Sequence, residues 1–139
     1  MTVMMQPQDA LALLHDLRSR TGEMDTKGLS DEVITRFCDF DPKLTQAINE
    51  ATVRFEEIVS EFGEDMLQRD EASIVEDLQS DFVNFYAPAT VNPYIALSGR
   101  GPWIVTAYGA VLHDNGGYGM LGAGPVSYTH LTLPTILLV

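Results

Sequence analysis

The feature that most constrains the fold is a change in the spacing of apolar residues near position 90 of this 139-residue chain. Before that point, apolar side chains recur at the three- and four-residue intervals of amphipathic helices. After it, short β-prone runs alternate with glycines, a pattern typical of hairpins and loops. We therefore predict an α+β protein. Its mainly α N-terminal half, with about four helices, precedes a small antiparallel β-hairpin and a glycine-rich loop.

Local signals predict where the helices begin and end. Asp41 followed by Pro42 is the clearest helix start, because a carboxylate caps the helix and proline lacks only an N–H that has no partner there. Gly63 is expected to end this helix, since glycine tolerates the backbone angles of a C-cap. The other helices are expected from Pro7, from the candidate N-cap Ser30 to about Cys38, and from about Glu71 to Tyr86.

Each long helix carries an apolar stripe that is expected to pack in a core rather than to hold a cofactor. In chain order these residues are Ala10, Leu11, Leu14 and Leu17, then Leu44, Ala47, Ile48, Ala51, Phe55, Ile58, Val59 and Phe62, then Ile74, Val75, Leu78, Phe82 and Phe85 or Tyr86.

Charge is concentrated in the same half. Residues 1–90 hold 7 of the 8 basic and 19 of the 20 acidic residues, so they carry the whole net charge of −12. An acidic surface repels phosphates and anionic lipids, so we expect neither nucleic acid nor membrane as a partner. The sequence starts without a signal-peptide pattern, and no apolar run reaches the roughly 20 residues of a membrane span. Together with the single cysteine, these features indicate a cytoplasmic protein.

Two residues of the helical half could carry chemistry, and both are interpreted as structural. Cys38 stands beside Phe37 and Phe40, which favours a small core residue over a nucleophile. His15 lies among leucines, with no second ligand nearby at metal-binding spacing, so a structural or surface histidine is expected.

The second half reads as a hairpin followed by a glycine-dense segment. Residues 103–105 and 110–112 are β-prone, and residues 106–109 between them read as a turn in which Gly109 can take a positive φ. Beyond Asp114, glycines 117, 119 and 122 have the spacing of a dinucleotide-binding turn, G-x-G-x-x-G. That motif needs a following helix and a later acidic residue, and neither follows here. A nucleotide-binding loop over residues 117–124 remains the third hypothesis.

An ordered series of residues over about 93–124 resembles the N-terminal segment of class III aminotransferases, the ornithine, 4-aminobutyrate and lysine ω-aminotransferase kind. The series is Gly99-Arg-Gly101-Pro-Trp103-Ile-Val105, then Gly109, Leu112, Asp114 and Gly116-Gly117-Tyr118. Two positions depart from the family pattern: Thr106 stands where an aspartate is usual, and Pro125 where a histidine is usual.

The resemblance implies a fold-type I, pyridoxal 5'-phosphate-dependent enzyme that transfers an amino group from a small-molecule donor to a keto acid, as a homodimer. It implies that Tyr118, flanked by Gly117 and Gly119, faces the substrate. The family's Schiff-base lysine, the acid that pairs with the pyridine nitrogen and the phosphate-binding loop come later than this segment. We therefore expect this chain to contain no catalytic or cofactor-binding residue and to be inactive alone, as an N-terminal part of the enzyme.

The last residues have a different resemblance. Residues 126–135 read VSYTHLTLPT, which is what one reading frame of a transposase-based sequencing adapter encodes. We therefore interpret residues 125–139 as an artefactual tail and place no site residue in it. The sequence then divides into an acidic helical extension, 1–90, a truncated aminotransferase hairpin segment, 91–124, and this tail. The competing hypothesis is an acidic helical interaction or regulatory module without catalytic activity.

Overall fold

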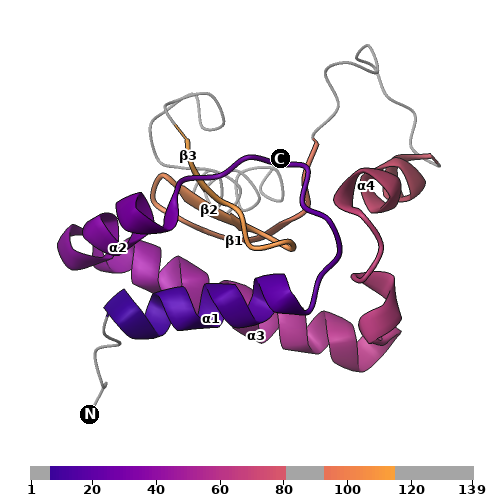
Figure 1. Cartoon of the computed structure of the whole chain (residues 1–139), viewed down its shortest axis with the longest axis horizontal. Coiled ribbons are helices and arrows are strands. Elements are labelled where there is room, and N and C mark those ends of the chain that lie inside the picture. Colours follow the sequence, from indigo (N-terminus) through magenta and orange to yellow (C-terminus); the bar gives the residue numbers. More distant parts are fainter. Residues whose placement is uncertain (1–6, 81–92, 115–139) are drawn as a thin grey trace, which may run out of the picture.

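A computed structural model describes residues 7–80 and 93–114 of the chain (Figure 1). The described elements are α1 (Pro7–Ser19), α2 (Asp31–Phe40), α3 (Pro42–Phe62), the single-turn 3-10 helix η1 (Glu64–Met66), α4 (Glu71–Gln79), β1 (Ala96–Arg100), β2 (Trp103–Thr106) and β3 (Val111–His113). The predicted α+β class, with helices first and a small antiparallel sheet after them, is confirmed. The predicted glycine-rich loop lies outside the described residues.

The cap signals around α3 work as predicted. The Asp41 side chain accepts a hydrogen bond from the backbone N–H of Lys43 at 3.0 Å, and Pro42 is the first helical residue. Gly63 ends the helix at φ 86°, and its N–H donates to the carbonyl of Val59. Ser30 takes the N-cap position of α2 without a side-chain capping bond, and α2 continues past the predicted end to Phe40.

Two residues that were predicted to lie on buried stripes are exposed. Phe62 is 59% exposed and Leu78 is 44% exposed. The buried residues of α3 end at Phe55, and Ile58 and Val59 pack against the core only in part, so Phe62 at the end of the helix lies beyond it. In α4 the buried apolar side chains are Ile74 and Val75, and the helix is described only to Gln79. The predicted continuation to residue 86 lies outside the described residues.

The sheet is an antiparallel meander in the order β1-β2-β3. Trp103 lies opposite Arg100 on one side and His113 on the other, so it belongs to the central strand. The predicted hairpin is β2 with β3, and β1 adds a strand that the sequence did not indicate. The register of β1 shifts between Ala96 and Ser98.

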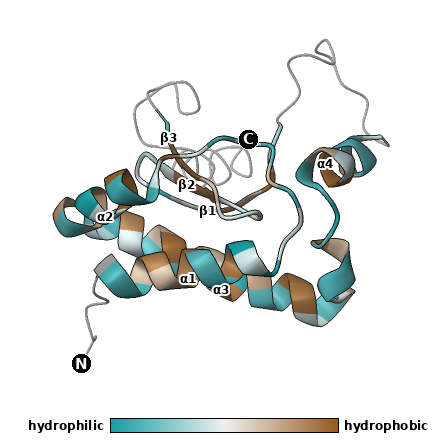
Figure 2. Ribbon diagram, in the orientation of Figure 1, coloured by the Kyte–Doolittle hydropathy of each residue, from teal (hydrophilic) through white to brown (hydrophobic). Residues whose placement is uncertain are grey.

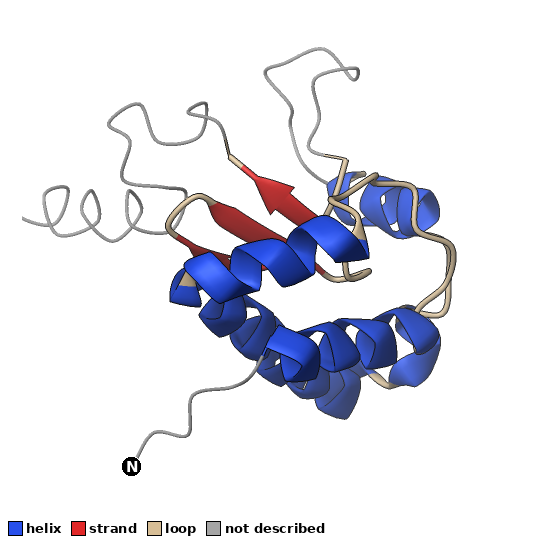
Figure 3. Cartoon of the chain, turned by 60° about the vertical axis from the view of Figure 1, so that its left-hand side comes forward, coloured by secondary structure: helices blue, strands red, loops and turns tan. Residues whose placement is uncertain are grey.

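The helices pack as a layer against the sheet. Helix α3 packs against β1 and β2, and α1 packs against α2 and α3. Figures 1 and 3 show α1 and α3 side by side along one face of the strands, with α2 and α4 at opposite ends. Figure 2 shows β2 as a largely hydrophobic strand, whereas the helices carry both hydrophobic and hydrophilic bands. The helical half therefore covers the sheet.

Two clusters of buried side chains make up the described core, and each combines both halves of the sequence. The first contains Ala10, Leu14, Ile34, Cys38, Leu44, Ala47, Ile48 and Ala51 with Trp103, Val105 and Val111. The second contains Leu17, Phe55, Leu67 and Ile74 with Ala107 and Tyr108. In both clusters, side chains from before residue 90 thus pack against side chains from after it.

Candidate functional site

The residues predicted to bind substrate, Gly117, Tyr118 and Gly119, lie outside the described residues. The structure describes the strand that leads to them. β3 ends at His113, and the backbone N–H of the next residue, Asp114, donates to the carbonyl of Pro102 at 2.7 Å. Asp114 is therefore held beside the β1–β2 turn at the point where the predicted segment begins.

The turn between β2 and β3 is closed by its own backbone and by one hydroxyl. Gly109 adopts φ 80°, as predicted, and its N–H donates to the carbonyl of Thr106. The Thr106 side chain is fully buried, and its Oγ1 accepts from the N–H of Ala110 at 3.0 Å. The Thr106 hydroxyl therefore supplies the turn with a side-chain hydrogen-bond acceptor.

Long-range hydrogen bonds fix this turn to the helices. The fully buried Tyr108 donates its hydroxyl to the carbonyl of Arg69 at 2.7 Å, and Arg18 donates its Nε to the carbonyl of Gly109 at 2.9 Å. Burial, helped by the negative charges of Glu71 and Asp70, raises the pKa of Tyr108 to about 12. Tyr108 is therefore a neutral hydrogen-bond donor at ordinary pH.

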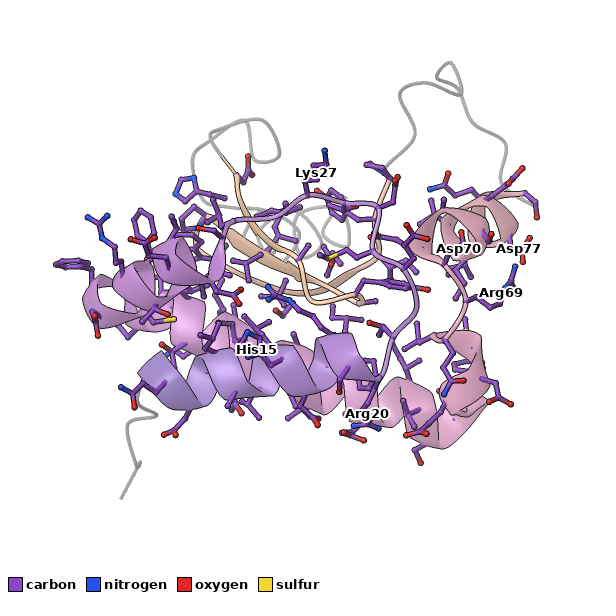
Figure 4. The ribbon with its side chains drawn as sticks, viewed as in Figure 1. His15, Arg20, Lys27, Arg69, Asp70 and Asp77 are labelled. Carbon is purple, nitrogen blue, oxygen red and sulfur yellow. The ribbon has the colours of Figure 1, made fainter. Side chains whose placement is uncertain are left out.

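His15, Arg18 and Asp31 form a polar cluster between α1 and α2. The two oxygens of Asp31 contact His15 Nε2 at 2.6 Å and Arg18 Nη1 at 2.7 Å. The Arg18 guanidinium, and next the His15 ring, lower the pKa of Asp31. The interpretation of His15 as a structural or surface residue is confirmed, since its ring joins α1 to the start of α2 (Figure 4). Because Arg18 also reaches Gly109, this cluster supports the hairpin turn.

Three aromatic rings in successive contact connect α2, β2 and the end of β3. The rings of Phe37 and Trp103 lie 5.2 Å apart, and those of Trp103 and His113 lie 4.8 Å apart in an edge-on arrangement. Trp103 is 2% exposed and donates its Nε1–H to Asp41 Oδ2 at 2.7 Å. Asp41 thus caps α3 and also holds β2, a second role that no local sequence signal indicates.

Cys38 is a core residue, as predicted. It is buried in the first cluster, and burial raises the pKa of its thiol. A thiol with a raised pKa is a poor nucleophile. Its position supports packing rather than chemistry.

The described residues do not fit pyridoxal phosphate. A lysine that holds this cofactor needs a partly enclosed site with an acid placed for the pyridine nitrogen. The described lysines are both exposed: Lys27 projects from the loop before α2 (Figure 4), and Lys43 lies against Gly101. We therefore assign no cofactor chemistry to the described residues.

The described part of the chain also contains no cluster of three or more histidine, cysteine, aspartate or glutamate side chains that could hold a metal ion. Among the helices in residues 7–80, none combines the length and the apolar character needed to cross a membrane.

What the described residues define is a small antiparallel sheet, covered by acidic helices, that leads at Asp114 into the predicted substrate segment. Protein-family models, curated proteins and solved structures gave no match to this chain. The function is therefore argued from the residues themselves.

Proposed function

We propose that the chain is the N-terminal part of a class III, pyridoxal phosphate-dependent aminotransferase of fold type I. In this proposal β1–β3 form the small N-terminal sheet, and the segment after Asp114 brings Tyr118 to the substrate. The substrates are a small-molecule amino donor and a keto acid, and the enzyme is a cytoplasmic homodimer. The cofactor supplies the chemistry of amino-group transfer when it is bound, and this chain supplies part of the substrate-facing surface.

The observation that carries the proposal is the meander that ends beside Asp114. Its two turns contain glycines with positive φ, Gly101 at 56° and Gly109 at 80°. Trp103 lies on the central strand, and Asp114 follows the last strand directly. The class III resemblance predicts the strand–turn–strand order of these residues. The Thr106 hydroxyl further supports it, because it supplies the turn with a side-chain acceptor at the one hairpin position that departs from the pattern.

The first test is sequencing of the source locus with long reads across the codon of Gly124. The proposal expects the reading frame to continue through Gly-His into several hundred codons that contain a lysine in a pyridoxal phosphate site. A locus that encodes VSYTHLTLPTILLV and then a stop codon would contradict both the adapter interpretation and the aminotransferase proposal.

The second test uses protein. The longer product should transfer amino groups from ornithine, lysine or 4-aminobutyrate, whereas the 139-residue chain should show no absorbance band of bound pyridoxal phosphate. In the longer product, Tyr118→Phe should raise KM for the amino donor more than it lowers kcat, because it removes one hydroxyl from the proposed substrate contact. Lys27→Ala is the matched control and should change neither, since Lys27 is exposed on a loop of the helical half.

An acidic interaction module is the second candidate. It is favoured by Phe40, which is 81% exposed at the end of α2. The two proposals differ in what residues 1–90 do alone. Because both described clusters include side chains from beyond residue 90, we expect the isolated piece to lack a cooperative thermal transition. A cooperative transition would favour the independent module.

A further inference from the structure

Glu71 is a buried carboxylate that the proposed function does not use. It is the first residue of α4 and is 0% exposed. Its Oε2 accepts hydrogen bonds from the backbone N–H groups of Asp25 and Thr26, both at 2.8 Å, and its own N–H donates to the carbonyl of Glu23 at 2.9 Å. Glu71 therefore fastens the segment 23–26 to the start of α4 through its side chain and its backbone N–H.

Two polar atoms at this contact are buried without a hydrogen-bond partner among the described residues: Oε1 of Glu71 and Oγ1 of Thr26. The two residues are joined by a hydrogen bond, since the backbone N–H of Thr26 donates to the other oxygen of the same carboxylate at 2.8 Å. Leaving a buried oxygen unpaired is costly, by about 1–3 kcal/mol for a neutral group and more for a charged one. The pair therefore marks a site for a third group that satisfies both atoms.

The chemistry of the two atoms limits what can bind. An ionised carboxylate oxygen only accepts hydrogen bonds, so the ligand must donate at least one. The threonine hydroxyl can donate or accept, so one small molecule with two hydrogens can satisfy both atoms. Asp70 and Asp25 flank the contact on either side in sequence, which disfavours an anion. A metal ion would require more ligands than this one carboxylate provides, and no metal-binding cluster exists among the described residues.

We propose that Glu71 and Thr26 bind one internal water molecule, which bridges Oε1 and Oγ1. Internal waters of globular proteins occupy sites of this kind, where they pair otherwise unsatisfied polar groups. The water completes the fastening of the loop to α4. A few residues further along the same loop, Leu29 donates its N–H to the carbonyl of Val111 at 2.8 Å, so the loop bridges α4 and β3.

The experiment compares the full 139-residue chain with two Thr26 variants. A crystal structure that resolves ordered solvent should show one water within hydrogen-bond distance of both atoms. Oxygen-17 relaxation dispersion in solution should count one long-lived water fewer in Thr26→Val, which keeps the side-chain shape and removes the hydroxyl. Thr26→Ser keeps the hydroxyl and should keep the water. Glu71→Gln is a control for the charge: its amide has the shape of the carboxylate and can still hydrogen-bond to the water, so the water should stay.

Three results would overturn the proposal. A direct hydrogen bond between the Thr26 hydroxyl and Oε1, with no density between them, would show that the two atoms satisfy each other. Density with contacts of about 2.3–2.6 Å from several oxygens, replaceable by a heavier cation, would show a metal ion. An unchanged number of long-lived waters in Thr26→Val would show that no water binds between these two atoms.

Discussion

Removing the Asp41 carboxylate should destabilise the protein at two places at once. One oxygen caps α3 through the N–H of Lys43 at 3.0 Å, and the other accepts the indole N–H of Trp103 at 2.7 Å. Loss of an N-cap costs about 1 kcal/mol. The Trp103 N–H would also lose its partner while the side chain stays 2% exposed, which costs roughly 1–3 kcal/mol. We expect Asp41→Ala to lower the free energy of unfolding by about 2–4 kcal/mol.

The assay is chemical denaturation of the full chain, with a double-mutant cycle to separate the two contributions. Trp103→Phe removes the indole donor, so Asp41→Ala should then cost only the cap, about 1 kcal/mol. The coupling energy between the two positions should therefore be about 1–3 kcal/mol. Asp41→Asn is the matched control: its single oxygen can serve one donor but not both, so it should fall between the wild type and Asp41→Ala.

The result that would refute this reasoning is additivity. If Asp41→Ala costs the same in the wild type and in Trp103→Phe, the bond between α3 and β2 contributes nothing and the capping role explains the whole loss. If Asp41→Ala changes stability by less than about 0.5 kcal/mol, neither hydrogen bond matters in solution.

Three further changes test the polar contacts and the loop. Arg18 lowers the pKa of Asp31 in the folded protein. The stability from this pair is therefore present above the pKa of the unfolded carboxyl, and it is lost as pH falls through the folded pKa. Asp31→Asn should make the free energy of unfolding depend less on pH in the acid range. Tyr108 has a raised pKa of about 12, so its stability contribution is full below its unfolded pKa and is lost as pH rises toward 12. Tyr108→Phe should cost about 1 kcal/mol by denaturation and remove that alkaline loss. Gly28→Ala should lower the melting temperature far more than Gly63→Ala. The Cβ added at position 28 would lie 2.8 Å from the backbone of β3. The Cβ added at position 63 would meet no atom within 4 Å, so that variant is strained only by the positive φ of the residue.

Local signals in the sequence predicted the helices well because the causes of these helices are local. A capping carboxylate before a proline starts α3, and a glycine ends it, whatever packs against the helix. The buried stripe from Leu44 to Phe55 follows from helical periodicity alone. The exposure of Phe62 does not, because it depends on how far the partner surface extends along the helix.

Strand β1 was missed because its residues are poor strand formers. Ser98 and Gly99 lower the β-propensity of a five-residue strand, and pairing with the apolar strand β2 overrides this preference. The candidate substrate residues 117–119 remain a prediction, since they lie outside the described residues. What the structure adds to them is a described starting point, Asp114, and the contacts that hold the hairpin before it.

Several contacts that no sequence pattern indicated involve the loop between α1 and α2. Glu71 looks like an ordinary acidic residue in the first turn of a helix, yet it is fully buried because two backbone N–H groups of this loop point at it. β3 is a short edge strand, and an edge strand exposes unpaired backbone groups. The N–H of Leu29 satisfies one of them, the carbonyl of Val111. The loop thus pairs one backbone group at the sheet edge. It needs Gly28 there because a side chain would collide with the backbone of Val111.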